Sequence, residues 1–448
     1  MNRFLATIFF IGLATVQYTV AAGDLIDFGN GNRDATNSLQ SQVDSGVKLI
    51  EFPPGTYRIT RPIEIDLDKI VYCSLRGCSA TKIVMQGAGS AFRFKGTHFK
   101  SADPGGFEQR VWDRERMPQV QDMAIQGAHR EADGIEAVGT MQLTVSRVHL
   151  RKLRHGIHLV KNNRNIIVES CHMYENSGVG LLLDNVNLHQ INVTGCHISY
   201  CDQGGIVSRD GNVRNLHITG CDLESNTSAD EQPTANVFID FRGSSYGTAE
   251  VAITGCTIQH SDKEANSANI RIHGGSMPTA KLPKIREGHI TITGNILSDV
   301  QHNIWLDSCR GVTITGNTCW MGFQHNLLLE NCSHIVVGPN SFDRNPRYAY
   351  GHATDALNRL VIRNCTDCTM SGLHVALVTG PGLSLTDCDR MNVSGLTVLD
   401  CDVGLQLKNI SRIRFANCLI HDDRGNAQPV KLSREGRVEN KFDDSFDP

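Results

Sequence analysis

The sequence predicts an all-β fold, a right-handed parallel β-helix in which coils of about 22–25 residues stack into a solenoid. Two short motifs alternate along the chain, and each returns about once per coil. In both motifs apolar and polar residues alternate, as in short strands that bury one face. A single coil cannot bury that face, but stacked coils bury it between parallel sheets. No helical segment returns with the repeat, which argues against a leucine-rich-repeat solenoid.

The first motif reads apolar, polar, glycine or another small residue, and then Cys, Asn or an apolar residue. Clear copies end at Cys171, Cys196, Cys221, Cys256, Asn295 and Asn317. The second motif begins with Gly or Asn and places apolar residues at the next position and two positions later. Its copies begin at Gly156, Gly180, Gly205, Asn236, Asn269, Asn303, Asn326, Gly382 and Gly404. Because strands of neighbouring coils lie about 4.8 Å apart, residues at one motif position form a row along the solenoid.

Eight of the fifteen cysteines follow such rows. We expect two interior ladders, formed by Cys171, Cys196, Cys221 and Cys256 and by Cys309, Cys332, Cys365 and Cys388. Thiols pack in such rows as small hydrophobes, so we expect most of them to stay reduced. Cys73 and Cys78 lie outside the ladders and are the one local pair that could form a disulfide.

Both ends of the chain depart from the repeat. Residues 1–22 read as a signal peptide, with Arg3 before an apolar stretch and small residues at Val20-Ala21-Ala22. The stretch is short and interrupted for a membrane span, so we expect a secreted or periplasmic protein with no membrane anchor after cleavage. A short helix that begins near Asp34 would cover the open end of the solenoid. We expect the β-helix to span residues 23–420 and a polar tail to follow at 421–448.

One passage near the start carries a family resemblance. The predicted helix is followed by a strand, the turn Pro53-Pro54-Gly55-Thr56-Tyr57 and a second strand. This order resembles the beginning of the pectate-lyase-like right-handed parallel β-helix superfamily, and the later repeat is similar to the coils of that superfamily. The resemblance implies the fold. The catalytic motifs of polygalacturonase-type hydrolases and of calcium-dependent pectate lyases are absent, so no catalytic residue can be transferred from them.

Composition limits the partners. Charged residues make up 20% of the chain and the formal net charge is −4. No basic excess is available to neutralise phosphates, which argues against a nucleic-acid partner. We expect a monomer.

The second motif also predicts which residues point away from the core. One outward row contains Phe238, Arg271 and Trp305, and the next contains Asp184, Arg209, Asp240, His273, Asp307 and Glu330. Arg242 shares this face, and Tyr246 lies on the loop that follows. Insertions at 224–235, 243–250, 260–268 and 274–288 lie beside the same coils, so we expect them to wall a groove. Solvated solenoid faces also carry paired charges without any function.

A groove with charges and aromatic rings suits a polysaccharide, and three reactions stay open. A hydrolase needs two carboxyl groups, such as Asp307 and Glu330 on neighbouring coils or Asp184 and Asp240 two coils apart. A lyase or an epimerase needs a base, a cation and an acid. His273 could be the base, with Arg242 or Arg271 as the cation and Tyr246 as the acid. Carboxylates such as Asp184 and Asp240 could instead hold Ca²⁺. The alternative is a non-catalytic carbohydrate-binding or adhesin-like solenoid.

Overall fold

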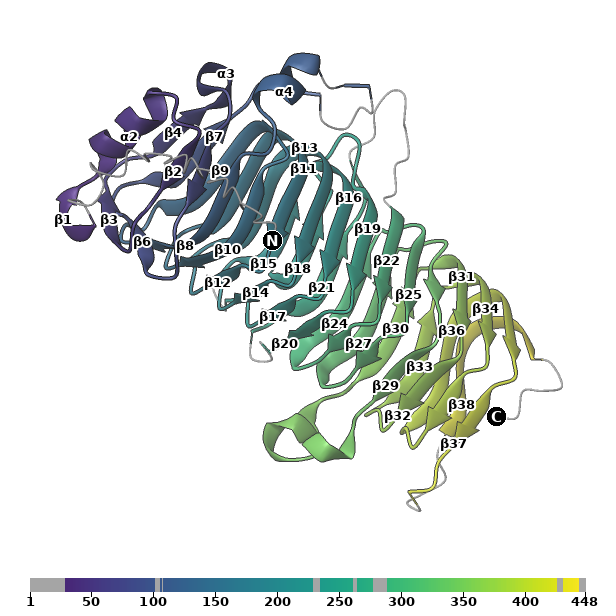
Figure 1. Ribbon diagram of the computed structural model, residues 1–448. Helices are drawn as coiled ribbons and strands as arrows, with labels where there is room; N and C mark the ends of the chain where they lie inside the picture. The colour runs from purple at the N-terminus through teal and green to yellow at the C-terminus, as the bar shows by residue number, and fades with distance from the viewer. Residues whose placement is uncertain are drawn as a thin grey trace, which may run out of the picture.

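The computed structural model describes residues 29–100, 105–106, 108–228, 234–260, 264–276, 288–424 and 430–442. The predicted signal peptide at 1–22 lies outside the described residues. Across the described residues the structure is an elongated stack of coils, with the N-terminal helix at one end (Figure 1). Strands at equivalent positions of successive coils pair in parallel, and these pairings connect all 38 strands of the described part. The predicted parallel β-helix is therefore confirmed.

Three strand positions recur in each coil, and they define three sheets. Sheet 1 contains β4 (Ile63–Asp66), β7 (Gly89–Lys95), β9 (Ala132–Met141), β11 (Ile157–Glu169), β13 (Val179–Thr194), β15 (Gly204–Arg209), β18 (Ala235–Asp240), β21 (Ala268–His273), β24 (Val300–Asp307), β27 (Gly322–Glu330), β30 (Arg359–Arg363), β33 (Pro381–Thr386), β36 (Val403–Ala416) and β38 (Val430–Phe442). The long strands β11, β13, β36 and β38 continue from sheet 1 into sheet 2.

Sheets 2 and 3 follow in the same coils. Sheet 2 contains β2 (Leu49–Glu51), β5 (Ser74–Arg76), β8 (Gln119–Gly127), β10 (Thr144–Arg151), β16 (Asn212–Thr219), β19 (Ala249–Thr254), β22 (Gly288–Thr293), β25 (Val312–Thr315), β28 (Val336–Val337), β31 (Thr366–Ser371) and β34 (Asp389–Ser394). Sheet 3 contains β1 (Asn30–Asp34), β3 (Gly55–Ile59), β6 (Thr81–Met85), β12 (His172–Tyr174), β14 (His197–Ser199), β17 (Asp222–Glu224), β20 (Thr257–Gln259), β23 (Ile296–Leu297), β26 (Thr318–Cys319), β29 (Asn340–Asp343), β32 (Leu373–Ala376), β35 (Thr397–Leu399) and β37 (Leu419–His421).

The predicted capping helix is α2 (Thr36–Asp44), at the N-terminal end of the stack. Leu39 and Val43 are buried and belong to the main hydrophobic core, so this helix closes the open end of the solenoid. Asp34 accepts a hydrogen bond from the main-chain N–H of Thr36 at 2.9 Å, which satisfies one of the free donors of the first turn. The other short helices lie between coils: α3 (Leu67–Ile70), α4 (Gln109–Arg114), η1 (Pro346–Tyr348) and η2 (Gly351–Asp355).

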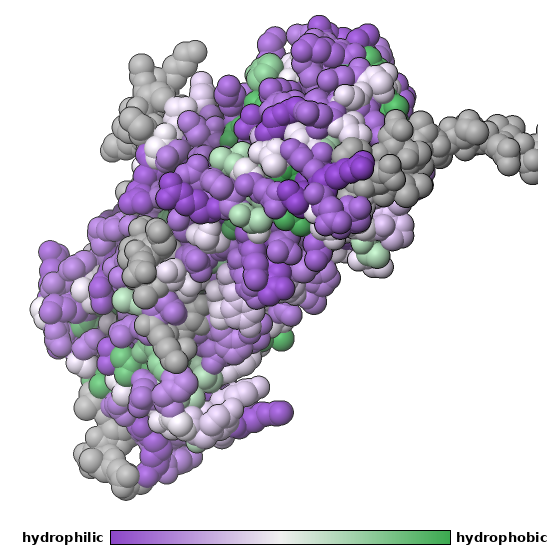
Figure 2. All heavy atoms as spheres, turned by 90° about the vertical axis from the view of Figure 1, so that its left-hand side faces the viewer, coloured by the Kyte–Doolittle hydropathy of each residue, from purple (hydrophilic) through white to green (hydrophobic). Residues whose placement is uncertain are grey.

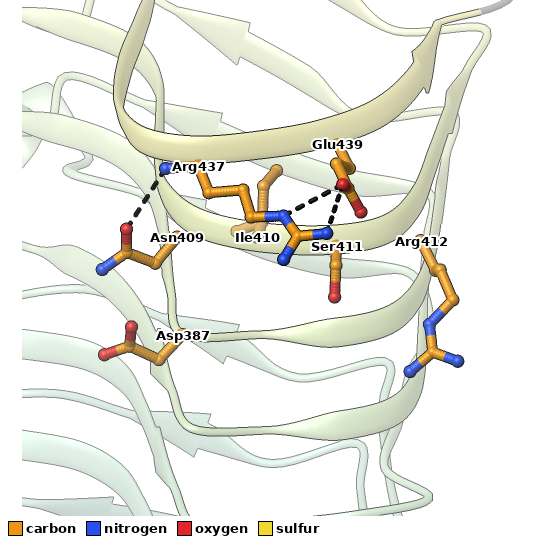
Figure 3. A pocket seen from close by; sticks show the side chains of 7 residues that line it. All are labelled: Asp387, Asn409, Ile410, Ser411, Arg412, Arg437 and Glu439. Atoms are coloured by element: carbon orange, nitrogen blue, oxygen red, sulfur yellow. Dashed lines mark hydrogen bonds and ion pairs between the residues drawn. The ribbon is translucent and has the colours of Figure 1, made fainter.

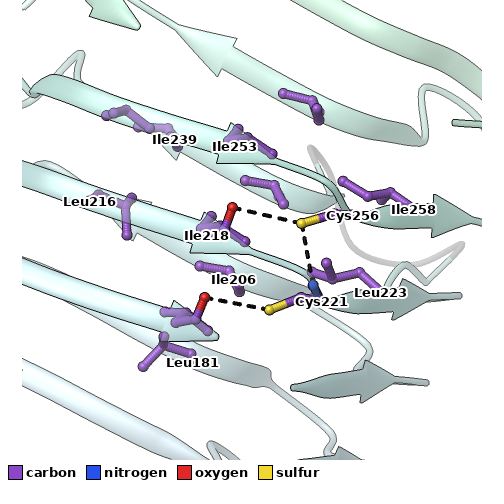
Figure 4. Close-up of a cluster of buried hydrophobic side chains, with 14 of the residues drawn as sticks. Leu181, Ile206, Leu216, Ile218, Cys221, Leu223, Ile239, Ile253, Cys256 and Ile258 are labelled. Carbon is purple, nitrogen blue, oxygen red and sulfur yellow. Dashed lines mark hydrogen bonds between the residues drawn. The ribbon is translucent and has the colours of Figure 1, made fainter. Parts of the chain in front are cut away.

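The interior consists of stacked rows of aliphatic side chains (Figure 4). Ile206 of β15 and Ile239 of β18 lie one coil apart on the inner side of sheet 1, and both are buried. By contrast, the face of the molecule in Figure 2 is mainly hydrophilic, with hydrophobic residues in small separate patches. The period-two alternation of the sequence thus separates the core from the surface, as expected.

Both predicted cysteine ladders are interior, and all fifteen cysteines, which lie within the described residues, are reduced thiols. The Sγ of Cys256 contacts the carbonyl oxygen of Ile218, one coil earlier, at 3.7 Å. It also accepts a hydrogen bond from the main-chain N–H of Cys221 at 3.4 Å (Figure 4). The ladder therefore connects neighbouring coils through weak sulfur contacts and not through disulfides.

Asparagine continues the first ladder where cysteine stops. The side-chain oxygen of Asn295 accepts from the main-chain N–H of Cys256 at 3.0 Å, and Asn317 and Asn340 repeat the contact in the next coils. A second ladder at the start of the sheet 1 strands runs through Asn236, Asn269, Asn303 and Asn326, with side-chain amide bonds of 2.7–2.8 Å. These asparagines are the residues that begin the second sequence motif. Each pairs a buried amide with the next coil, so the ladders fix the register of the stack.

The backbone conformation explains why the first motif contains a glycine. In Gly195 and Gly220, which precede Cys196 and Cys221, the backbone is left-handed, with φ of +59° and +60°. Glycine adopts this conformation without the steric cost that a Cβ brings. The motif therefore marks the turn from sheet 2 to sheet 3.

Stacked strands continue beyond residue 420, where the sequence predicts only a polar tail. Strand β38 (Val430–Phe442) pairs in parallel with β36, with Leu432 opposite Leu405 and Val438 opposite Ile410. The sequence pattern ends too early because β38 places the charged Arg434 opposite the buried Leu407, at a position where the preceding strands have an apolar residue.

Candidate functional site

The outer face of sheet 1 carries the two predicted rows in the predicted order. In the first row, Phe238, Arg271 and Trp305 are direct strand partners in β18, β21 and β24. The second row runs through Asp184, Arg209, Asp240, His273, Asp307 and Glu330 in the same way. The register that the alternation predicts is therefore correct.

Much of this face is nevertheless buried. Phe238 is 2% exposed, and Arg271 and His273 are each 7% exposed. A small hydrophobic cluster, separate from the main core, lies on the same face and contains Val179, Leu182, Val207, Ala235, Phe238 and Ala268. The predicted outward direction is right, but outward residues here are not all open to solvent.

Arg271 lies between two aromatic rings. Its guanidinium carbon is 3.9 Å from the centre of the Trp305 ring and 5.8 Å from that of Phe238. Its Nε donates a hydrogen bond to Nε2 of His273 at 2.9 Å. Burial lowers the pKa of Arg271 to about 10. Within the described part of the chain, no carboxylate forms an ion pair with this guanidinium, so its charge is balanced only at longer range.

His273 connects Arg271 to Asp307. Because Nε2 accepts from Arg271, the ring proton belongs on Nδ1, which lies 3.5 Å from Oδ2 of Asp307. Asp307 also accepts from Asn331 at 2.8 Å and from Ser308 at 3.0 Å. The hydrogen bond from His273, aided by those from Asn331 and Ser308, lowers the pKa of Asp307 to about 2 despite partial burial. His273 is thus held between two partners, and its Nε2 is not available as a base in this arrangement.

Asp240 is tied to Arg242. Its two carboxylate oxygens accept from Nε and Nη2 of Arg242 at 2.9 and 2.6 Å. Burial raises the pKa of Asp240, but the hydrogen bonds from Arg242 outweigh it, and the net shift is downward. Two coils earlier, Asp184 lies 3.2 Å from Nε2 of His158, and this contact lowers the pKa of Asp184.

Tyr246 is not brought into the cluster of Arg271 and His273. Its side chain lies on the loop after β18 and is 60% exposed. The described hydrogen bonds of this residue are made by its main chain, to Asn212, Ser244 and Arg214. The insertions at 224–235, 260–268 and 274–288, which were expected to form the walls of the groove, lie in part outside the described residues.

No metal centre is formed by the described residues: nowhere in them do three His, Cys, Asp or Glu side chains gather around one point. The carboxylates considered for Ca²⁺, Asp184 and Asp240, each contact a histidine or an arginine.

A hollow of about 500 Å³ lies further along the same face, beyond the predicted residues. Its lining includes His325, Arg359, Val361, Arg363, Pro381, Ser384, Thr386, Asp387, Gln406, Lys408 and Glu435. Glu330 joins it to the predicted cluster, because its carboxylate accepts from Nε1 of Trp305 at 3.1 Å and lies 3.6 Å from Arg363. The hollow lies past Glu330, the last residue of the predicted outward rows. The motif copies at Gly382 and Gly404 continue those rows and are the sequence signal for it.

Two histidines form a pair at the edge of this hollow. His302 and His325 are strand partners in β24 and β27, and their Nδ1 atoms lie 3.0 Å apart. The rings are stacked, with an interplanar angle of 12°. Burial lowers the pKa of His302 to about 3 and that of His325 to about 4, so both rings are neutral near pH 7.

Comparisons with known proteins agree with this architecture. Residues 68–258 match the family described as right handed beta helix region, and residues 242–442 match the family described as periplasmic copper-binding protein (NosD). Each match covers less than half of the chain, and the first one agrees with the right-handed parallel β-helix fold of the structure. No curated protein matches its sequence at a significant level.

Solved β-helix structures resemble it over nearly the whole chain. Tailspike protein 3 of bacteriophage CBA120 is 14% identical, with a TM-score of 0.52 over 93% of this chain and 60% of the tailspike. This β-helix therefore spans less than two thirds of that protein. The A-module of a mannuronan C-5 epimerase from Azotobacter vinelandii is 14% identical, with a TM-score of 0.41 over 94% of this chain and 99% of the module. PfbA, a surface adhesin of Streptococcus pneumoniae, is 12% identical, with a TM-score of 0.44 over 90% and 93%. At this identity the likeness to the tailspike shows the fold alone.

A second hollow of about 620 Å³ lies at the C-terminal coils of the β-helix, where sheet 1 turns into sheet 2 (Figure 3). Arg437 of β38 donates to Glu439 at 2.9 Å, and its main-chain N–H donates to Asn409 at 3.3 Å. Asp387 lines both hollows.

In the described residues no helix is long and apolar enough to cross a membrane.

Proposed function

We propose that this β-helix binds an acidic polysaccharide along the outer face of sheet 1 and acts on it by removing a proton next to a sugar carboxylate. Lyases and epimerases use this chemistry. The observation that carries the proposal is Arg271, a buried cation stacked on Trp305 with no carboxylate partner in the described residues. A guanidinium in such a place favours a carboxylate ligand, and an aromatic ring beside it favours a sugar ring.

Hydrolysis is less well supported. Glycoside hydrolases need one carboxylic acid with a raised pKa, which protonates the leaving oxygen. In Asp184, Asp240 and Asp307 the pKa is lowered by hydrogen bonds from neighbouring His, Arg, Asn or Ser side chains. These three carboxylates stay ionised near neutral pH and cannot supply that proton.

One observation favours a second function, that of a non-catalytic carbohydrate-binding or adhesin-like solenoid. Asp240 and His273, both predicted to be catalytic, are already engaged by Arg242, Arg271 and Asp307. Such mutual contacts also suit a rigid binding surface. Export is part of both proposals, and it rests on the signal-like residues 1–22 and on the periplasmic family matched by 242–442. We also propose that the protein is a monomer and that Asp184 and Asp240 bind Ca²⁺.

A panel of uronate-containing, sulfated and neutral polysaccharides tests the function. We expect binding to the uronate-containing members, measured by affinity electrophoresis and calorimetry. We also expect either unsaturated products, seen by ultraviolet absorbance, or altered stereochemistry at the carboxylate-bearing carbon, seen by NMR. Binding without either product would favour the non-catalytic solenoid. New reducing ends without unsaturation would indicate hydrolysis, and preference for neutral chains would contradict the proposal.

A further inference from the structure

We infer that the hollow beside β27, β30 and β33 is the reaction centre for a uronate residue, with His325 as the proton acceptor and Arg359 and Arg363 as the carboxylate clamp. This inference rests on the proposed function and makes it more specific. It moves the chemistry from His273, the histidine that the sequence favours, to a histidine about two coils further along the same face.

The geometry of His325 suits a base better than that of His273. Nδ1 of His325 is held by Nδ1 of His302 at 3.0 Å, and His302 is only 5% exposed. The ring is therefore anchored on one side. Nε2 of His325 has no hydrogen-bond partner in the described part of the chain, and the residue lines the hollow. In the tautomer where His325 donates through Nδ1, Nε2 carries the lone pair that accepts a proton.

The cations of the hollow are placed for a carboxylate. Arg359 is the strand partner of His325 in β30, and its described hydrogen bond goes to the carbonyl oxygen of Thr379 at 3.0 Å. Arg363 lies in the same strand and contacts Glu330 at 3.6 Å. Three cations, including Lys408, face two carboxylates in the lining. Arginine binds carboxylates through two parallel hydrogen bonds, so a uronate fits between these side chains.

Substrate binding would also raise the pKa of His325. Burial is the first cause of the lowered pKa of His325, and the charges of Arg363 and Arg359 add to it. A bound carboxylate neutralises these two charges, so it raises the pKa of His325 toward the range where an imidazole works as a base near pH 7. The empty site thus keeps His325 unprotonated, and the occupied site makes it more basic.

The reaction in this centre is a β-elimination. The bond between hydrogen and the carboxylate-bearing carbon breaks, and the proton moves to Nε2 of His325. The electron pair enters an enolate-like intermediate that Arg359 and Arg363 stabilise. It then forms a double bond to the neighbouring carbon, whose bond to the glycosidic oxygen breaks. The leaving oxygen takes a proton from a solvent water molecule that enters the hollow.

Two variants test this assignment in the full-length chain on the uronate polysaccharide that the wild type cleaves. His325→Gln should lower kcat for unsaturated product by about 10²–10⁴-fold while the Kd for the polysaccharide changes less than about threefold. Arg359→Met should raise KM and Kd together. The matched control is Arg147→Met, because Arg147 pairs with Asp122 on sheet 2 and lies outside the hollow. Circular dichroism melting would show that every variant is folded.

The outcomes separate this inference from the proposed function. Full elimination activity in folded His325→Gln would overturn the assignment, while cleavage by the wild type would still support the function. Stereochemical inversion without unsaturation, lost in His325→Gln, would keep the base but overturn the elimination. If the wild type neither binds nor cleaves any uronate polysaccharide, the proposed function fails and this inference fails with it.

Discussion

Arg271 and Trp305, on neighbouring strands of sheet 1, form a stacked pair in which the guanidinium carbon lies 3.9 Å from the ring centre. Such a contact is worth about 0.5–2 kcal/mol, and more when water is excluded. It holds a cation that is 7% exposed and that no carboxylate pairs with in the described residues. The pair therefore keeps a charge in place at some desolvation cost, which is expected of a binding residue more than of a structural one.

Replacing Arg271 should separate binding from stability. In Arg271→Met a side chain of similar volume removes the buried charge, so we expect an unchanged or slightly raised melting temperature. The Kd for the acidic polysaccharide should rise at least tenfold. Arg271→Lys should lose affinity as well, because an ammonium neither stacks nor bonds in two places as a guanidinium does. Unchanged affinity in folded Arg271→Met would contradict the binding role.

The arrangement of the rows could be predicted because it depends only on local alternation. Phe238, Arg271 and Trp305 stand at the same position of one motif, and stacking makes them neighbours whatever the loops between them do. The same reasoning placed Cys221 beside Cys256, whereas a helix-start signal near Asp34 placed the capping helix at the N-terminal end. Two repeat positions were therefore enough to predict the fold and the order of residues on its face.

The environment of each side chain could not be predicted in this way. The contacts of His273 with Asp307 and Arg271 depend on side-chain rotamers and on packing by neighbouring residues, and the sequence pattern predicts neither. The burial of Phe238 and Arg271 depends on the same two factors. The hollow at His325 depends on the small side chains of Pro381 and Ser384 in β33, which leave space between longer ones. The motif predicts the order of residues along a row, but it does not predict the space between their side chains.

Mild acid should destabilise the protein through its buried histidines. His98 and His302 are 1% and 5% exposed, and burial lowers their pKa to about 4 and about 3, below the unfolded value near 6.5. The unfolded chain therefore binds more protons below pH 6.5. The stability contributed by the neutral rings is complete above that pH and is lost as pH falls toward the folded values. Each ring should cost roughly 2 kcal/mol between pH 6.5 and 5.

Urea unfolding at pH 7.5, 6.5 and 5 measures this loss. His302→Phe keeps an aromatic ring at the site but cannot bind a proton, so its stability should fall less steeply over the same interval. His289→Phe is the control, because it makes the same substitution at an exposed histidine. A wild type whose stability is flat between pH 6.5 and 5 would contradict the buried neutral rings.

The asparagine ladder should be sensitive to a charge. Asn317 is 1% exposed, and its amide nitrogen donates to the carbonyl oxygen of Ile292 and to the side-chain oxygen of Asn340, both at 3.0 Å. Asn317→Asp replaces that donor by a carboxylate that faces two acceptors. We expect a loss of roughly 3–5 kcal/mol in the free energy of unfolding. Asn392→Asp on the exposed face of sheet 2 should change it by less than about 0.5 kcal/mol.

The thiols provide a test of the cysteine ladders that needs no substrate. Strands of neighbouring coils are about 4.8 Å apart, a distance at which two cysteines could form a disulfide if their side chains pointed at each other. Here the sulfurs turn to main-chain oxygens instead: Cys221 contacts the carbonyl oxygens of Val193 and Thr219 at 3.6 and 3.5 Å. Burial also raises the pKa of Cys201 and Cys388 to about 12, so few thiolates are present to start an exchange.

Titration with a thiol reagent should therefore give two different counts. Unreduced protein in denaturant should show all fifteen thiols, whereas the native protein should react quickly at about one. That one is Cys78, which is only partly buried and whose pKa is lowered by a hydrogen bond from Thr81. Cys78→Ser should remove the fast phase and leave fourteen thiols in denaturant. A wild-type count of thirteen, with the fast phase missing, would indicate a disulfide between Cys73 and Cys78. A count below eight would mean that the ladders themselves are oxidised, and that the sulfur-to-carbonyl contacts do not describe them.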